Sequence, residues 1–132
     1  MLRALSLLAA LLIAAPPRLA AQPAGSCEAA IAAVEPGAGL PPGLLSAIAR
    51  VESGRRLPGM ARPEPWPWAI NIGGQTRHAA NRAEAVALVQ QARAAGTRQI
   101  DVGCMQVSLG HHPDAFASLE EAFEPLANVT YA

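Results

Sequence analysis

Apolar and polar residues follow two periods along this chain, and together these predict several helices and one short β-hairpin. Apolar positions spaced three and four residues apart predict helices in four places. These are residues 26–35, 41–53, 82–95 and a last helix that opens near Pro125. Ser26 is placed to cap the first helix. Asn81 with Glu84, and Ser118 with Glu121, have the spacing of capping boxes.

The segment between the second and third helices has a different pattern. Residues 57–67 are rich in proline and predict a loop. Apolar and polar side chains then alternate over residues 68–72, Gly73 and Gly74 follow, and residues 75–78 can form the returning strand of a hairpin. Residues 100–102 predict a further extended segment. The chain is therefore expected to be mainly α, in an α+β fold with a small β-hairpin insert.

The first 21 residues have the layout of a secretory signal peptide. A positively charged start at Arg3 precedes an apolar run over residues 4–15, and small residues follow at Ala20 and Ala21. We expect cleavage after Ala21, which places one domain at 22–132. Two alternatives stay open, namely an uncleaved N-terminal anchor and a lipoprotein lipidated at Cys27.

Composition and charge narrow the possible partners. The 132 residues are 52% hydrophobic and 15% charged, which suits one packed domain. No segment after the signal is long and apolar enough for a stable membrane span. The ten basic residues, all arginine, balance ten acidic ones. Losing Arg3 and Arg18 with the signal leaves eight basic residues, so no basic face for nucleic acid is expected.

Two cysteines, Cys27 and Cys104, are the whole cysteine content. In an exported protein an even number suggests a disulfide, and two buried free thiols are the alternative. His111 and His112 are adjacent without a surrounding set of ligands, so we expect neither a metal site nor a cofactor. Trp66 and Trp68 could stack on sugar rings or pack within the hairpin.

Glu52 is the residue most suggestive of chemistry. On a helix, Leu45, Ile48 and Glu52 share one side, so the pattern places a carboxylate at the end of an apolar stripe. Burial and the negative end of the helix dipole both favour the protonated acid there. Protonation of a departing sugar oxygen needs such an acid. The alternative is a surface glutamate paired with Arg55 or Arg56.

Three segments resemble, in order, the lysozyme-like soluble lytic transglycosylases: Glu52-Ser53-Gly54, Gly103-Cys104-Met105-Gln106 and Asn128-Val129-Thr130-Tyr131-Ala132. Residues 68–74 and 100–103 are closest in style to the members that accompany type IV secretion systems. The resemblance implies a lysozyme-like domain that acts on peptidoglycan, in the periplasm or secreted. It also implies a cell-envelope secretion apparatus as a further partner. Because relatives continue beyond Tyr131, we expect the domain to be incomplete at its C-terminus.

The resemblance also implies roles for single residues. Glu52 matches the catalytic acid and base, and Ser53 helps to shape the site. Met105 and Gln106 match the pair that lines the sugar groove. The hydroxyl of Tyr131 is expected to face the catalytic carboxylate. Asn71 corresponds to an asparagine of the hairpin near the cleft, whereas Ser108 replaces a common asparagine.

The implied reaction needs one carboxyl group. Glu52 would protonate the bond between N-acetylmuramic acid and N-acetylglucosamine, and then take the proton of the muramic 6-hydroxyl as a 1,6-anhydro ring closes. An ordinary glycosidase uses two carboxylates, and here an internal hydroxyl replaces the second. Two rival functions remain, a muramidase of the same fold and a non-catalytic module that binds peptidoglycan or a secretion apparatus.

Overall fold

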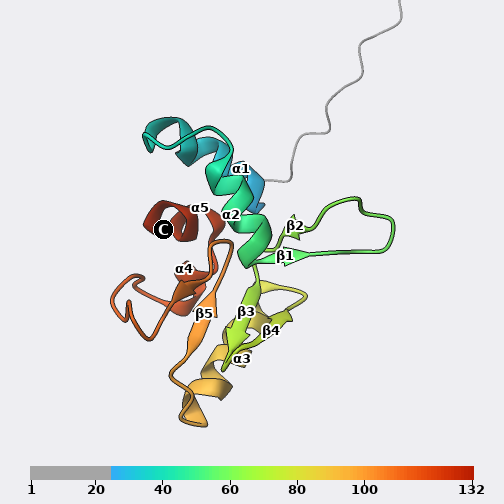
Figure 1. Cartoon of the computed structure of the whole chain (residues 1–132). Coiled ribbons are helices and arrows are strands. Elements are labelled where there is room, and N and C mark those ends of the chain that lie inside the picture. The colour runs from blue at the N-terminus through green and yellow to red at the C-terminus, as the bar shows by residue number, and fades with distance from the viewer. Residues whose placement is uncertain (1–24) are drawn as a thin grey trace, which may run out of the picture.

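A computed structural model describes residues 25–132, so the expected signal peptide lies outside the described residues (Figure 1). The described chain contains both helices and antiparallel sheets, which confirms the α+β class. In chain order the elements are α1 (Cys27–Val34), the 3-10 turn η1 (Glu35–Gly37), α2 (Leu44–Glu52), β1 (Gly54–Arg55), β2 (Glu64–Pro65), β3 (Ala69–Ile72), β4 (Gln75–His78), α3 (Arg82–Ala94), β5 (Ile100–Val102), β6 (Val107–Ser108), α4 (Leu119–Ala122) and α5 (Pro125–Tyr131).

The larger sheet has the strand order β4-β3-β5-β6, and all of its pairs are antiparallel. The predicted hairpin is its β3–β4 half. Gly73 and Gly74 both have positive φ, at 58° and 87°, as a two-residue type I′ turn requires. The segment predicted at 100–102 is β5, which pairs with β3 so that Ile70 faces Val102. The smaller sheet pairs β1 with β2.

Helix caps explain where several helices begin. Ser26 Oγ accepts a hydrogen bond from the N–H of Ala29, 3.1 Å away, and Asn81 Oδ1 accepts one from Glu84 at 2.9 Å. Ser118 Oγ does the same for Glu121 at 3.1 Å. These three predicted caps are confirmed, and α5 begins at Pro125 as predicted.

The second helix begins later than predicted. It starts at Leu44, after Gly43 in the left-handed region, and not at the prolines. The carboxylate of Glu35 caps it from outside, because its oxygens accept hydrogen bonds from the N–H groups of Gly43 (3.0 Å) and Leu45 (3.1 Å). A negative charge at this end also suits the helix dipole.

Two buried clusters hold the fold together. One lies between the larger sheet, α3 and α4, and has Phe123 and Ile70 among its fully buried members. The other joins α1, α2 and α5 around Cys27 and Cys104. Figure 1 shows α1, α2 and α5 together at one end and the larger sheet with α3 at the other. Ser53, at the end of α2, and the 103–106 turn, which follows β5, lie where the helical part meets the larger sheet.

Candidate functional site at the end of helix α2

Glu52 is the last residue of α2, as the pattern predicts, but its surroundings differ from the expectation. Its side chain is exposed, and Ile48 is 37% exposed. The buried face consists of Leu45, Ala49 and Ser53, spaced by four residues. The predicted buried stripe through Ile48 and Glu52 is therefore wrong. Ser53 points inward to the carbonyl of Cys104, and Glu52, one position earlier in the chain, faces solvent.

Ser53 connects the end of α2 to a distant turn of the chain. It is fully buried, and its hydroxyl lies 2.7 Å from the carbonyl oxygen of Cys104 and 3.0 Å from that of Ala49. Its own carbonyl accepts a hydrogen bond from the N–H of Trp66 at 3.2 Å. These hydrogen bonds of Ser53 fix the C-terminal end of α2 against the 103–106 turn.

The 103–106 turn is held from its other side by Asn128, which is fully buried. Its Oδ1 accepts a hydrogen bond from the N–H of Met105 at 2.9 Å, and its Nδ2 donates to the carbonyls of Val102 (3.0 Å) and Ala122 (2.9 Å). Gly103 has φ of +80°, and a Cβ there would overlap the Asn128 amide. Asn128 is not among the residues predicted for the site. The one sequence feature that could have indicated it is its position as the first residue of the third family-like segment, Asn128-Val129-Thr130-Tyr131-Ala132.

Gln106 and Asn71 use their amides within the fold. Gln106 has a φ of 50°, and its Nε2 donates to the carbonyls of Ala69 (3.1 Å) and Gly103 (3.0 Å). No residue between 25 and 132 donates to its Oε1, so that oxygen is available to a ligand. Asn71 Oδ1 accepts from the N–H of Gly74 at 2.9 Å and supports the hairpin turn. Met105 is half-buried and packs against the cluster around the cysteines.

Tyr131 lies in a different setting from the one expected. Its hydroxyl is 3.0 Å from Nδ1 of His112 and makes no hydrogen bond to Glu52. Its ring contacts those of His112 and Phe116, with centroids 5.6 and 5.4 Å apart, and the side chain is 44% exposed. Among the described residues, then, hydrogen bonds bring Ser53, Met105 and Gln106 into one region. Glu52 lies beside it because it precedes Ser53 in the chain, whereas Tyr131 has a different partner, His112.

The predicted disulfide joins Cys27 to Cys104, whose Cα atoms are 5.6 Å apart. Both cysteines are fully buried. The bond ties the first turn of α1 to the turn that carries Gln106.

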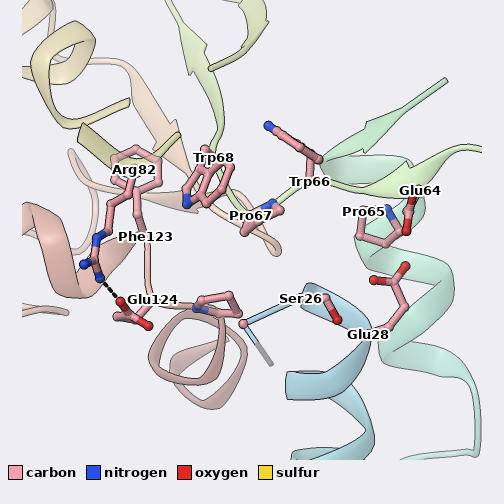
Figure 2. Close-up of a pocket in the computed structure, with 12 residues that line it drawn as sticks. Ser26, Glu28, Glu64, Pro65, Trp66, Pro67, Trp68, Arg82, Phe123 and Glu124 are labelled. Atoms are coloured by element: carbon pink, nitrogen blue, oxygen red, sulfur yellow. Dashed lines mark ion pairs between the residues drawn. The ribbon is translucent and has the colours of Figure 1, made fainter. Parts of the chain in front are cut away.

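A separate pocket of about 550 Å³ lies between α1, the 64–68 segment and α5 (Figure 2). Trp68 and Phe123 line it, and the carboxyl groups of Glu28 and Glu64 approach each other at one end. Burial raises the pKa of Glu28 above its ordinary value, Glu64 adds to the rise, and the backbone N–H of Glu28 and the charge of Arg50 oppose it. Glu28 Oε2 is buried without a hydrogen-bond partner in the described chain.

Trp66 and Trp68, the two candidates for stacking on sugar rings, line this pocket, but Glu52, Gln106 and the other residues implied by the resemblance do not. Trp66 donates from its ring nitrogen to the carbonyl of Ala79 at 2.7 Å, and its ring stands at 87° to that of Trp68 with centroids 5.3 Å apart. The guanidinium of Arg55 covers its face at 3.3 Å from the centroid. Trp66 therefore packs within the fold, against Trp68 and under Arg55.

No family model, curated protein or solved structure matches this chain. Within residues 25–132, none of the helices has both the length and the apolar character needed to cross a bilayer. The same part of the chain has no group of three or more side chains arranged to hold a metal ion.

Proposed function

We propose that this protein is an exported lytic transglycosylase of lysozyme-like fold that cleaves peptidoglycan strands with Glu52 as its acid and base. The observation that carries the proposal is the convergence of the three segments that resemble this family. Ser53 is hydrogen-bonded to Cys104, and Met105 to Asn128. A chance likeness of short segments, 51 and 23 residues apart along the chain, would not require them to be in contact.

The hairpin belongs to the same arrangement. The carbonyl of Ala69 in β3 accepts hydrogen bonds from the N–H of Gly103 at 2.9 Å and from Nε2 of Gln106. Gln106 therefore has a fixed position beside the strand that carries Asn71. Its free Oε1 can accept a hydrogen bond from a sugar hydroxyl or acetamido group.

The exposure of Glu52 bears on how the reaction would proceed. A general acid works best where water is excluded and its proton can pass only to the leaving oxygen. The described residues leave Glu52 in contact with solvent, so under this proposal the bound glycan itself covers the carboxyl group. Cleavage then transfers the Glu52 proton to the leaving oxygen, and the muramic 6-hydroxyl returns a proton to Glu52 as its oxygen bonds to C1.

Replacing Glu52 with Gln tests the proposal. The amide keeps the size of the side chain but neither delivers nor accepts the proton, and such groups typically contribute ~10²–10⁴-fold in rate. Both proteins are incubated with cell-wall sacculi, and the released fragments are measured by mass. Anhydro-muropeptides from the wild type alone are the expected result. Fragments heavier by one water would identify a muramidase instead, and equal release by both proteins would remove Glu52 from the mechanism.

Envelope targeting is part of the same proposal. It rests on the expected signal peptide and on the disulfide, which suits an oxidising compartment. The secretion apparatus remains a proposed partner through the resemblance alone.

A further inference from the structure

The β1–β2 connection beside Glu52 concentrates positive charge in a chain with no net charge. Four of the ten basic residues fall between positions 50 and 62, against one acidic residue, Glu52. Arg55, Arg56 and Arg62 lie in the segment 55–63, here called the basic arm. Arg56 and Arg62 are exposed and form no ion pair within residues 25–132. Figure 1 shows the arm projecting from the C-terminal end of α2.

The arm has a defined shape. Its base is the β1–β2 pair, in which Arg55 faces Glu64. Its tip is a turn with Pro58 and Gly59 at the centre, where Gly59 has φ of +84° and the N–H of Met60 donates to the carbonyl of Leu57 at 3.1 Å. Proline followed by a residue with positive φ is the sequence of a type II turn.

Close packing fixes the base of the arm to the fold. A Cβ at Gly54 would overlap the carbonyl of Arg50 and the ring of Pro63. The guanidinium of Arg55 lies on the face of Trp66. Arg56 and Arg62 are therefore carried on an ordered support next to Glu52. Four residues span at most ~14 Å when extended, so one bound strand could touch both Arg56 and Glu52.

We propose that the basic arm binds carboxylates of the stem peptides on peptidoglycan, so that the enzyme prefers strands that still carry their peptides. This inference rests on the proposed function and specifies which glycan strands the enzyme prefers as substrate. Guanidinium groups pair with carboxylates through two parallel hydrogen bonds. A glycan strand bound at Glu52 would present its stem peptides next to the basic arm. The exposed guanidinium groups of Arg56 and Arg62 complement the negative charge of the peptide carboxylates.

The test measures binding in the Glu52→Gln background, where strands are not consumed. The probes are intact sacculi and glycan strands stripped of peptides by an amidase, which leaves one lactyl carboxylate on each muramic sugar. The stripped strand therefore separates carboxylates of the stem peptides from the carboxylate of the sugar itself. We expect Arg56→Gln with Arg62→Gln to weaken binding to intact sacculi roughly threefold to tenfold, as two exposed ion pairs would, and to leave binding to stripped strands unchanged. The difference should vanish near ~1 M salt, where the screening length is ~3 Å.

The matched control is Arg77→Gln with Arg93→Gln, which removes the same charge from β4 and α3. An equal loss in the control, or no loss on sacculi, overturns the role of the arm. An equal loss on stripped strands overturns the stem peptides as its ligand, because those strands carry only the lactyl carboxylate of the sugar. Failure of the parent protein to bind either glycan overturns the proposed function together with it. Binding that does not depend on the arm overturns this inference alone.

Discussion

Asn128 shows how one side chain can determine the geometry of a candidate site. Its amide satisfies one N–H and two carbonyls, and it is fully buried. We predict that Asn128→Ala lowers the free energy of unfolding by ~3 kcal/mol or more, because each buried group left without a partner costs ~1–3 kcal/mol. Urea denaturation measures the change.

Asn71→Ala is the control, since its amide makes one hydrogen bond at an exposed turn. It should cost no more than ~1.5 kcal/mol. Similar losses in the two variants would contradict a special role for Asn128.

Glu28 is the residue whose ionisation should make stability depend on pH. Burial raises its pKa in the folded protein, so the native state holds this proton more tightly than the unfolded chain. Protonated Glu28 therefore contributes most to the free energy of unfolding at pH values below its ordinary pKa of about 4.5. This contribution is lost as the pH rises through the raised pKa of the folded protein.

We predict that Glu28→Gln is more stable than the wild type at pH 7 and that the two converge near pH 4. Urea midpoints at both values test this. A variant that is less stable at pH 7 would show that the Glu28 carboxylate makes a favourable interaction in the native state.

At the scale of the element, α2 depends on a residue outside it. Glu35 accepts hydrogen bonds from Gly43 and Leu45. Loss of a cap costs about 1 kcal/mol, and loss of a charge at a helix N-terminus adds ~0.3–1 kcal/mol. We predict that Glu35→Ala destabilises by about 1–2 kcal/mol and Glu35→Gln by less, as read from thermal unfolding. Asp114→Ala, which removes an exposed carboxyl group in a turn outside the helices, should stay within ~0.5 kcal/mol. If this control lost as much stability as Glu35→Ala, the hydrogen bonds of Glu35 to the start of α2 would not be the cause of the loss.

Elements with local signals could be predicted from the sequence. The caps at Asn81 and Ser118 and the Gly73-Gly74 turn depend on residues within four positions, and all appear in the structure. The strands β1, β2 and β6 have two residues each and exist only through their pairing with another strand. Two residues are too few to show an alternation of apolar and polar side chains, so periodicity could not predict these strands.

The face of α2 was mispredicted for a similar reason. Leu45 starts both the stripe through Ile48 and the stripe through Ala49 and Ser53, and hydrophobicity favours the first. The structure buries the second, because the hydroxyl of Ser53 finds an acceptor in the Cys104 carbonyl. That contact spans 51 positions of sequence. The identity of Glu52 as a candidate was thus accessible from the sequence, whereas its exposure depended on long-range packing.

At the scale of the whole molecule, the disulfide joins parts that are far apart in sequence. Cys27 and Cys104 are 77 residues apart, and both lie in the cluster that joins α1, α2 and α5. A loop of that length confines the unfolded chain strongly, and removal of such a bond from a small exported domain typically costs ~2–5 kcal/mol. Cys104 is also the residue whose carbonyl holds Ser53. Loss of the disulfide should therefore increase the mobility of Cys104 and of the end of α2 that is hydrogen-bonded to it, in addition to destabilising the whole domain.

We predict that Cys27→Ala with Cys104→Ala lowers the melting temperature by roughly 10–20 °C, at ~4–8 °C per kcal/mol. Wild type refolded and kept under reducing conditions, with both thiols free, should melt close to the double variant if the crosslink is the cause. Hydrogen exchange then separates global from local effects. If the bond positions the site, amides at residues 103–106 and at the end of α2 should lose more protection than those of α3, which belongs to the other cluster. Uniform loss across both clusters would mean that the disulfide stabilises the domain without a particular effect on the candidate site.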